Sequence, residues 1–267
     1  MQDNKRTIRA GIAALLTIIW AAVIMLVPPK YAFPHQFNHD VDSPILALEI
    51  SHDAADIDLV LRRSSPDSAR AIDFESQSNK LDLVFIPLYA FSLWSLARVF
   101  TDRTLFLTLL ILGAAFFDYW EDWRIFQALK GENPAIYIPS LAKWGLLGVV
   151  LFATGVILLR SKSPVYSLAS KRLLFLAYLL SSLLLLISVA LGSWIGYSLI
   201  ALGSAVFAAL FVVHAIAFLG PYLAIPGIKP VFVENFCEER KKAGKESLVA
   251  VKAEPADGRG FPPPSAG

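Results

Sequence analysis

Six long apolar segments constrain this chain more than any other feature of its sequence. Each has roughly the 20 residues that a helix needs to cross the hydrocarbon core of a bilayer. In lipid only a helix satisfies its own backbone groups within one segment, and none of these segments alternates as a strand would. We therefore predict an all-α membrane bundle of six transmembrane helices. The segments cover residues 10–27, 81–100, 105–126, 141–159, 173–191 and 195–219.

The composition fits a membrane protein and excludes some other classes. Hydrophobic residues make up 56% of the 267 residues, whereas soluble domains contain about 45–50% apolar residues. Cys237 is the single cysteine, which excludes an intrachain disulfide framework and a four-cysteine metal site. The net charge of +2 gives no indication of nucleic-acid binding. We predict neither a cofactor nor a nucleic-acid partner.

The first apolar segment begins like a signal peptide but does not continue like one. Lys5, Arg6 and Arg9 precede it. However, its apolar run exceeds the usual 7–15 residues of a signal peptide, and two prolines follow where a cleavage site with small residues would lie. We interpret this segment as an uncleaved membrane anchor.

The placement of lysine and arginine predicts the orientation of the bundle, because cytoplasmic loops carry an excess of both residues. With the N-terminus inside and six spans, sixteen of the 24 Lys and Arg residues fall on the cytoplasmic side. They lie at the N-terminus, after the second span, between the fourth and fifth spans, and in the C-terminal tail. Both ends of the chain are therefore predicted to be cytoplasmic.

The spans divide the chain into four parts. Residues 1–27 hold the N-terminus and the first span, 28–80 an outer loop, 81–219 the other five spans, and 220–267 a cytoplasmic tail that we expect to be largely disordered at its end. The outer loop is acidic, and its patterns over 45–50 and 54–63 predict two short helices. Since some fifty residues bury little core alone, these helices should pack on the bundle.

The fifth and sixth spans are joined by a very short turn and should form an antiparallel hairpin. Ala201, Ala205 and Ala209 recur at four-residue spacing in the sixth span. Small residues at this spacing let transmembrane helices approach closely. We expect this alanine stripe to serve packing.

Charged residues gather at the outer end of the third span. Asp118 follows thirteen uncharged residues, about 20 Å of helix, and so lies below the outer surface. Glu121 and Asp122 share its helix face one turn nearer to water. Two neighbouring spans bring Asp82 and Lys143 to the same depth. The candidate site therefore consists of Asp82, Asp118, Glu121, Asp122, Arg124 and Lys143.

Two interpretations of these residues are open, because an ionisable residue inside a span normally faces the bundle and has a partner. The first is an outward-open polar pocket that binds a cation, a head group or a small substrate. The second is a structural ion-pair network, in which Lys143 pairs with Asp118 or Asp122 and Glu121 pairs with Arg124. We favour the second interpretation.

Histidines add two further candidates. His35 and His39 are four residues apart and are followed by Asp40, which on a helix could form half of a zinc site. A solvated loop is the interpretation that we favour. His214 lies alone in the inner half of the sixth span, and we expect it to be a hydrogen-bonded packing residue and not a ligand.

Several short patterns resemble a group of small bacterial inner-membrane proteins with a D-x-x-E-N signature at the end of a span. They are A-L-E-I at 47–50, L-D at 81–82, F-I-P-L-Y at 85–89, D-x-x-E at 118–121 and K-W at 143–144. Asp122 stands where that group has asparagine. The resemblance covers roughly residues 45–145. It implies a multi-pass protein of the bacterial inner membrane and supports the candidate site, but it supplies no activity.

The sequence contains no catalytic motif such as H-E-x-x-H or G-x-S-x-G. Our main hypothesis is a non-catalytic sensor, scaffold or accessory module that uses its outer loop and polar site, with membrane lipids and another membrane or envelope protein as partners. One alternative is an enzyme on a lipid or envelope substrate, with Asp118 and Glu121 as its acid/base pair. Another is a carrier of a small solute or cation.

The predicted orientation can be tested by cysteine labelling in a background in which Cys237 is replaced by serine. A cysteine at Ser65 should react with a membrane-impermeant reagent in intact cells, because it lies in the outer loop. A cysteine at Ser163 should react only after permeabilisation. The reverse pattern would contradict the predicted orientation.

Overall fold

The computed structural model describes residues 2–26, 44–49, 51, 53–64, 66–163, 165–191 and 194–223. All regular structure in these ranges is α-helical, and five of the helices are long and apolar enough to cross a membrane. The predicted all-α membrane bundle is therefore confirmed. The helices are α1 (Gln2–Leu26), α2 (Pro44–Glu49), α3 (Ala54–Val60), α4 (Ser68–Phe100), α5 (Leu105–Leu129), α6 (Tyr137–Arg160), α7 (Leu168–Leu191) and α8 (Trp194–Leu223).

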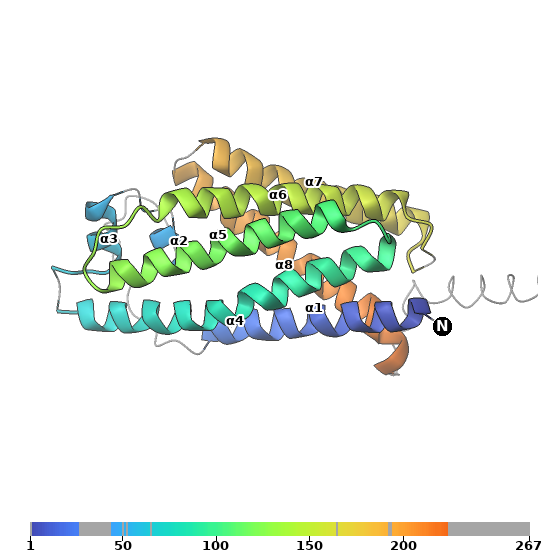
Figure 1. Ribbon diagram of the computed structural model, residues 1–267, viewed down its shortest axis with the longest axis horizontal. Coiled ribbons are helices and arrows are strands. Elements are labelled where there is room, and N and C mark those ends of the chain that lie inside the picture. The colour runs from blue at the N-terminus through green and yellow to red at the C-terminus, as the bar shows by residue number, and fades with distance from the viewer. Residues whose placement is uncertain are drawn as a thin grey trace, which may run out of the picture.

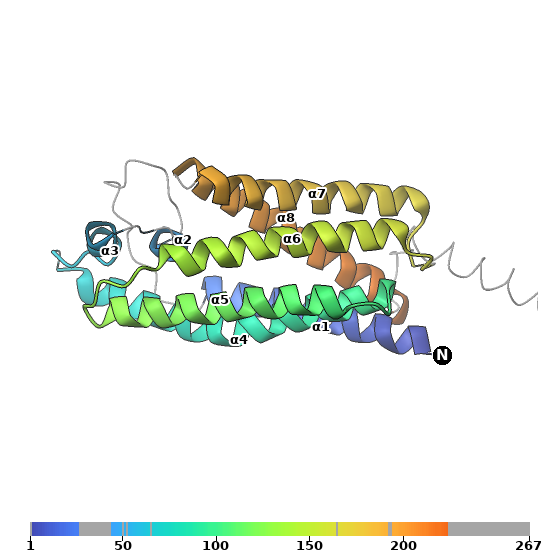
Figure 2. The same cartoon turned by 45° about the horizontal axis from the view of Figure 1, so that its top comes forward.

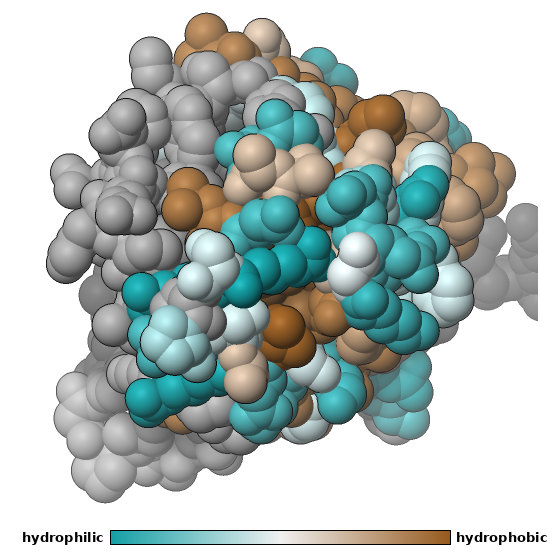
Figure 3. All heavy atoms as spheres, turned by 90° about the vertical axis from the view of Figure 1, so that its left-hand side faces the viewer, coloured by the Kyte–Doolittle hydropathy of each residue, from teal (hydrophilic) through white to brown (hydrophobic). Residues whose placement is uncertain are grey.

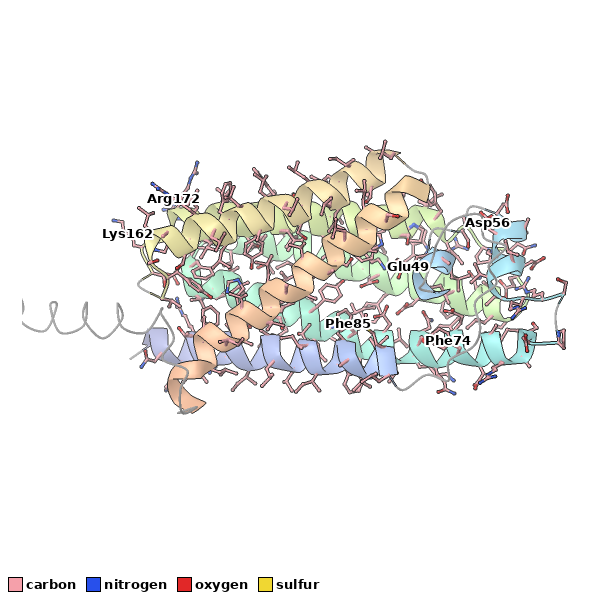
Figure 4. All side chains as sticks on the ribbon, turned by 180° about the vertical axis from the view of Figure 1, so that it is seen from behind. Glu49, Asp56, Phe74, Phe85, Lys162 and Arg172 are labelled. Atoms are coloured by element: carbon pink, nitrogen blue, oxygen red, sulfur yellow. The ribbon has the colours of Figure 1, made fainter. Side chains whose placement is uncertain are left out.

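The six long helices lie side by side along the longest axis of the molecule (Figures 1 and 2). Each of them packs mainly against two others, and the pairs α1–α4, α4–α5, α5–α6, α6–α7, α7–α8 and α8–α1 close a ring. Helix α8 crosses the bundle obliquely (Figure 4). The two short helices, α2 and α3, lie together at one end of the bundle (Figure 1). We call them the outer cap and this end the outer end, because the sequence predicts that it faces away from the cytoplasm.

The two ends of the bundle differ in charge. The start of α1 and the end of α8 lie at the same end (Figure 1), where Arg6 forms a 2.7 Å ion pair with Asp102 in the turn between α4 and α5. Lys162 and Arg172 lie at this end too, whereas Glu49 and Asp56 lie at the opposite end (Figure 4). The uneven placement of Lys and Arg residues, from which the orientation is predicted, is therefore present in the structure as a difference in charge between the two ends of the bundle.

Helix α5 is the long helix that lacks the composition of a membrane span. It has 25 residues, as many as α1, but its second half carries Asp118, Glu121 and Asp122. It nevertheless packs between α4 and α6, with Leu107 and Ile111 in the shared hydrophobic core. The charged part of α5 is accommodated because its three acidic side chains are buried inside the protein.

Helix α4 is longer than the sequence predicts. It begins at Ser68 and not at Leu81, so residues 68–80, predicted as outer loop, belong to the helix. Its 33 residues span about 50 Å, well beyond the ~30 Å of a hydrocarbon core. The extension is stable because Ala71, Glu75 and Ser78 are buried where α4 packs against α5 and the cap. Hydropathy does not reveal it, since this buried face is partly polar.

The outer cap confirms the two predicted short helices and their packing on the bundle. Asp53 caps α3 by accepting a hydrogen bond from the backbone N–H of Asp56 at 3.0 Å. The helix ends at Val60, earlier than the predicted 63, because the chain turns at Arg62 with a φ of 51°. An apolar cluster joins the cap to α5 and to the turn before α6: Ala47, Leu48, Ile57, Val60, Leu61, Ile125, Ala128 and Ile136.

The prediction that the alanine stripe of α8 packs against another helix of the bundle is wrong. Ala205 and Ala209 are exposed. The residue of α8 that meets α7 closely is Gly203, where an added Cβ would lie 2.9 Å from a side-chain atom of Leu185. The hydroxyl of Ser181 donates a 2.8 Å hydrogen bond to the carbonyl of Gly203. Helices α7 and α8 therefore approach each other at Gly203, which lies on a different face of α8 from the alanines.

Helices α6 and α7 also meet at a glycine, and this contact gives a stability prediction. A methyl group at Gly155 would lie 2.8 Å from the Cβ of Tyr178, whereas at Gly145 the nearest atom would lie 4.0 Å away. We expect Gly155→Ala to lower the free energy of unfolding in detergent by about 1–3 kcal/mol through overpacking. Gly145→Ala is the matched control and should be neutral or stabilising by up to about 1 kcal/mol. Equal melting temperatures for the two variants would contradict the close approach.

Candidate functional site

Lys143 is the centre of a buried ionic cluster at the outer end of the bundle. Its Nζ lies 2.8 Å from Oε2 of Glu121, 3.1 Å from Oδ1 of Asp118 and 3.2 Å from Oε2 of Glu49. All four side chains are buried. An ammonium group has three N–H donors, so three carboxylates can satisfy it completely. We call these four residues the Lys143 cluster.

The local sequence brings the members of the cluster together from three helices. Asp118 and Glu121 are three residues apart on α5 and so share a helix face. Lys143 lies in the second turn of α6, which follows α5 after the short connection 130–136 and returns alongside it. Glu49 is the last residue of α2 and joins the outer cap to the membrane helices.

Aromatic side chains position the carboxylates. The hydroxyl of Tyr89 on α4 donates a 2.8 Å hydrogen bond to Oδ2 of Asp118. The indole N–H of Trp144 donates a 3.0 Å hydrogen bond to Oε2 of Glu49. The ring of Trp144 also lies 4.7 Å from Nζ of Lys143, a cation–π contact that is more favourable away from water. Four helices, α2, α4, α5 and α6, therefore meet at this cluster.

The other predicted site residues form no ion pair with Lys143. Asp82 is half-buried on α4, and no ion pair of Asp82 is found within the described ranges. Asp122 is buried, and its Oδ2 has no hydrogen-bond partner; its backbone carbonyl accepts a 3.1 Å hydrogen bond from Asn79. Arg124 donates to Gln127 and lies over the ring of Trp120. The structure thus pairs Glu121 with Lys143 and not with Arg124.

Four side chains of this region are absent from the predicted site: Glu49, Glu75, Tyr89 and Trp144. Glu49 is the only acid in the apolar run 45–50. An isolated charge in an apolar run is the sequence feature from which its burial could be predicted. Glu75 lies seven residues, two helical turns, before Asp82 and so on the same face of α4. The sequence does not place Glu75 in the site, because it predicts residues 68–80 as part of the outer loop.

The region contains more carboxylates than cations. Glu49, Asp118 and Glu121 bind Lys143, whereas Glu75, Asp82 and Asp122 do not. We call the latter three residues, on α4 and α5, the acidic flank. Hydrophilic residues cover much of the end face of the molecule that carries the cap (Figure 3). The acids of the Lys143 cluster and Asp122 are instead buried beneath that surface.

Metal-ligating side chains do not converge within the part of the chain that the structure describes. There, no group of three or more His, Cys, Asp or Glu side chains is arranged to hold a metal ion. The candidate zinc ligands His35, His39 and Asp40 lie outside the described residues.

His214 on α8 occupies the packing role predicted for it. It is fully buried, and its Nδ1 and Nε2 lie 2.6 Å and 2.8 Å from the hydroxyls of Tyr166 and Tyr178. Phe100 and Phe218 pack against the imidazole ring. A neutral imidazole has one donor and one acceptor, so one tyrosine donates and the other accepts. Both ring nitrogens are occupied by this network.

Comparison with protein-family models, curated proteins and solved structures found no match to this chain. The resemblance to the D-x-x-E-N group therefore stays a prediction. Any function has to be inferred from the geometry of the outer end.

The ion pairs of the Lys143 cluster predict how substitutions of its members change the stability of the protein. Removing one partner of a buried ion pair costs about 3–5 kcal/mol, so Lys143→Met should destabilise the protein by that amount in a detergent melt. Adding Asp118→Leu should recover only part of the loss, because Glu49 and Glu121 would still be unpaired. Lys130→Met, at an exposed lysine in the α5–α6 turn, is the control and should be neutral.

The double-mutant cycle decides whether the contact exists. If Lys143 and Asp118 interact as the structure shows, the effects of Lys143→Met and Asp118→Leu will not add. Additive effects would mean that the two side chains do not touch and that α5 and α6 are not neighbours through these residues.

Proposed function

We propose that this integral membrane protein is a non-catalytic sensor or accessory module of the bacterial inner membrane, in which the outer cap responds to a ligand of the outer polar site. The observation that carries the proposal is the contact between Glu49 and Lys143. Through it, a residue of the cap shares one ammonium group with two acids of helix α5. The position of the cap therefore depends on the charge balance inside the bundle.

The cap is small enough for this contact to matter. Helices α2 and α3 have six and seven residues, too few to be stable alone. They are held by the apolar cluster with α5, by Glu49, and by a hydrogen bond from Arg63 to the carbonyl of Ala128. A change of charge near Lys143 alters one of these few attachments. Local electrostatic changes that bias a marginally held element are a general basis of switching.

The geometry is less suited to acid/base catalysis by Asp118 and Glu121. Such a pair needs two different environments, so that one carboxyl keeps its proton and the other loses it. Here both side chains are buried and both contact the same ammonium group. Their similar surroundings support a binding role.

A cation carrier is the second candidate, because the acidic flank leaves buried carboxylates without a cation. A carrier usually binds its substrate at helices broken near the middle of the membrane. Pro87 could mark such a break, but α4 continues through it from Ser68 to Phe100. This continuity favours a binding module over a carrier.

The proposed partners follow from the surface of the bundle. Large apolar side chains are exposed along the sides of α1, α5, α6 and α7 and would contact membrane lipids. A sensor also needs a protein to which it reports, and the outer cap is the element whose position would change. We propose a membrane or envelope protein that contacts the cap.

The role of Glu49 can be tested by hydrogen exchange in detergent. Glu49→Gln keeps the shape of the side chain but removes its charge, and a hydrogen bond to a charged group contributes about 1.5–3 kcal/mol. The amides of α2 should therefore exchange roughly ten times faster or more than in the wild type. Glu132→Gln, an exposed acid at the same end, is the control and should leave α2 unchanged. Unchanged exchange in Glu49→Gln would contradict the proposed link.

Co-purification from the native membrane tests the function itself. A stoichiometric protein partner that is retained by the wild type and by Glu132→Gln, but lost from Glu49→Gln, would support the sensor or accessory role. Turnover of a bound lipid would instead support the enzyme. Accumulation of a solute by proteoliposomes would support the carrier.

A further inference from the structure

Two basic residues of α1 lie on a face of the helix that points away from the bundle. Lys5 and Arg9 are both exposed, and they share this face because they are four residues apart, about one helical turn. Neither forms an ion pair within the residues that the structure describes. Their charges are therefore available to an anion from outside the chain.

The same face continues along α1 as an apolar surface. Ile12, Leu16 and Ile19 follow Arg9 at three- and four-residue spacing, and they are 46%, 47% and 49% exposed. Helix α1 is long and apolar enough to cross a membrane, and it lies along one edge of the bundle (Figure 1). Its exposed apolar side chains would contact the acyl chains of lipids, which places Lys5 and Arg9 at the level of the head groups.

Arg6 shows that a neighbouring cation of the same helix is used differently. Successive residues of a helix are rotated by about 100°, so Arg6 leaves the face of Lys5. Its Nη1 forms a 2.7 Å ion pair with Oδ1 of Asp102 in the turn between α4 and α5. Arg6 therefore joins the start of α1 to the rest of the bundle, and its charge is matched by the protein itself.

The other long helices offer no such pair of exposed cations one turn apart within the described residues. Toward the same end of the bundle, α6 and α7 each carry a single exposed basic residue, Arg160 and Arg172. Lys171 is buried and donates a 2.9 Å hydrogen bond to the carbonyl of Ser161. The two cations on α1 are therefore a local feature and not only part of the general positive charge of this end.

We propose that Lys5 and Arg9 bind the phosphate of an acidic phospholipid, whose acyl chains lie along the apolar face of α1. Side chains one helical turn apart have Cβ atoms about 5–6 Å from each other, so both can reach one phosphate group. A guanidinium donates two parallel hydrogen bonds to phosphate oxygens, and an ammonium adds a compact positive charge. The charges select an acidic head group, and the adjoining apolar face selects a lipid over a free anion.

A lipid at this site would stabilise the closure of the helical ring. Helix α1 closes the ring through its contacts with α4 and α8. Toward α8, an added Cβ at Gly11 would lie 2.8 Å from a side-chain atom of Leu219. Toward α4, the hydroxyls of Thr17 and Ser92 are 2.7 Å apart. Because a ligand that binds only the folded state stabilises that state, acidic lipid should raise the melting temperature. This inference goes beyond the proposed function and does not depend on it.

The test measures lipid binding by the full chain in a nonionic detergent at fixed pH and ionic strength. Dioleoyl-phosphatidylglycerol is the acidic probe, and dioleoyl-phosphatidylcholine is the zwitterionic control with the same acyl chains. Native mass spectrometry gives the dissociation constant of the first bound lipid, and thermal melting gives the stabilisation. We expect saturable binding and a higher melting temperature with phosphatidylglycerol and neither effect with phosphatidylcholine.

Three variants locate the site. Arg9→Gln and Lys5→Gln should each weaken binding of phosphatidylglycerol about fivefold, which corresponds to about 1 kcal/mol for one basic residue near a membrane surface. Both positions are exposed, so these variants should melt like the wild type in phosphatidylcholine. Arg6→Gln is the matched control, because it removes one positive charge from the same part of α1 but from a side chain that pairs with Asp102. It should leave the dissociation constant nearly unchanged.

Four outcomes would overturn the inference. Equal weakening by Arg6→Gln and Arg9→Gln would mean that the overall charge of this end attracts the lipid without a site. Equal binding of phosphatidylglycerol and phosphatidylcholine would leave only apolar contact. Competition by inorganic phosphate or glycerol 3-phosphate would assign a small anion in place of a lipid. Unchanged binding in both Arg9→Gln and Lys5→Gln would place the acidic lipid elsewhere on the bundle.

Discussion

A buried ammonium group at the outer end of a hydrophobic bundle would be very costly unless its charge were matched, and the surrounding structure is organised around that requirement. Glu49, Asp118 and Glu121 each place an oxygen within 3.2 Å of Nζ of Lys143. The carboxylates come from the cap and from α5, the lysine from α6, and Tyr89 of α4 holds Asp118. Removing the lysine would leave three buried carboxylates without their cation. The cluster therefore determines how the cap, α5 and α6 are positioned relative to one another.

The two ends of the bundle are stabilised by different kinds of interaction. At the outer end, three carboxylates surround one ammonium group, and Glu75, Asp82 and Asp122 form no ion pair within the described residues. Toward the other end, His214 is held between Tyr166 and Tyr178 in an aromatic surrounding. A neutral network of this kind responds little to ions in solution. The outer end, in contrast, is held by ion pairs around Lys143, and the loss of one charge there is costly.

Much of the fold could be predicted from the sequence, because the relevant signals are local. Segment length and hydropathy identified the long helices, since each must satisfy its own backbone in lipid. The charge of the loops separated the two ends of the bundle. Counting residues from the start of the third span placed Asp118 at the depth where the structure has Lys143. The extension of α4 to Ser68 could not be predicted in this way, because its buried face contains Glu75 and Ser78 and so lacks the apolar signal.

The sequence by itself determined which segments are helical, how deep their charged residues lie and which end is acidic. Only the tertiary structure decided which charges meet. Successive residues on a helix are rotated by about 100°, so the rotation of α5 against α6 selects Asp118 and Glu121 for Lys143 and leaves Asp122 on the flank. Glu49 reaches Lys143 from far away in the chain, and Gly203 replaces the alanines at the contact with α7. Which of these residues contact one another depends on how neighbouring helices pack, and a local sequence pattern contains no information about that packing.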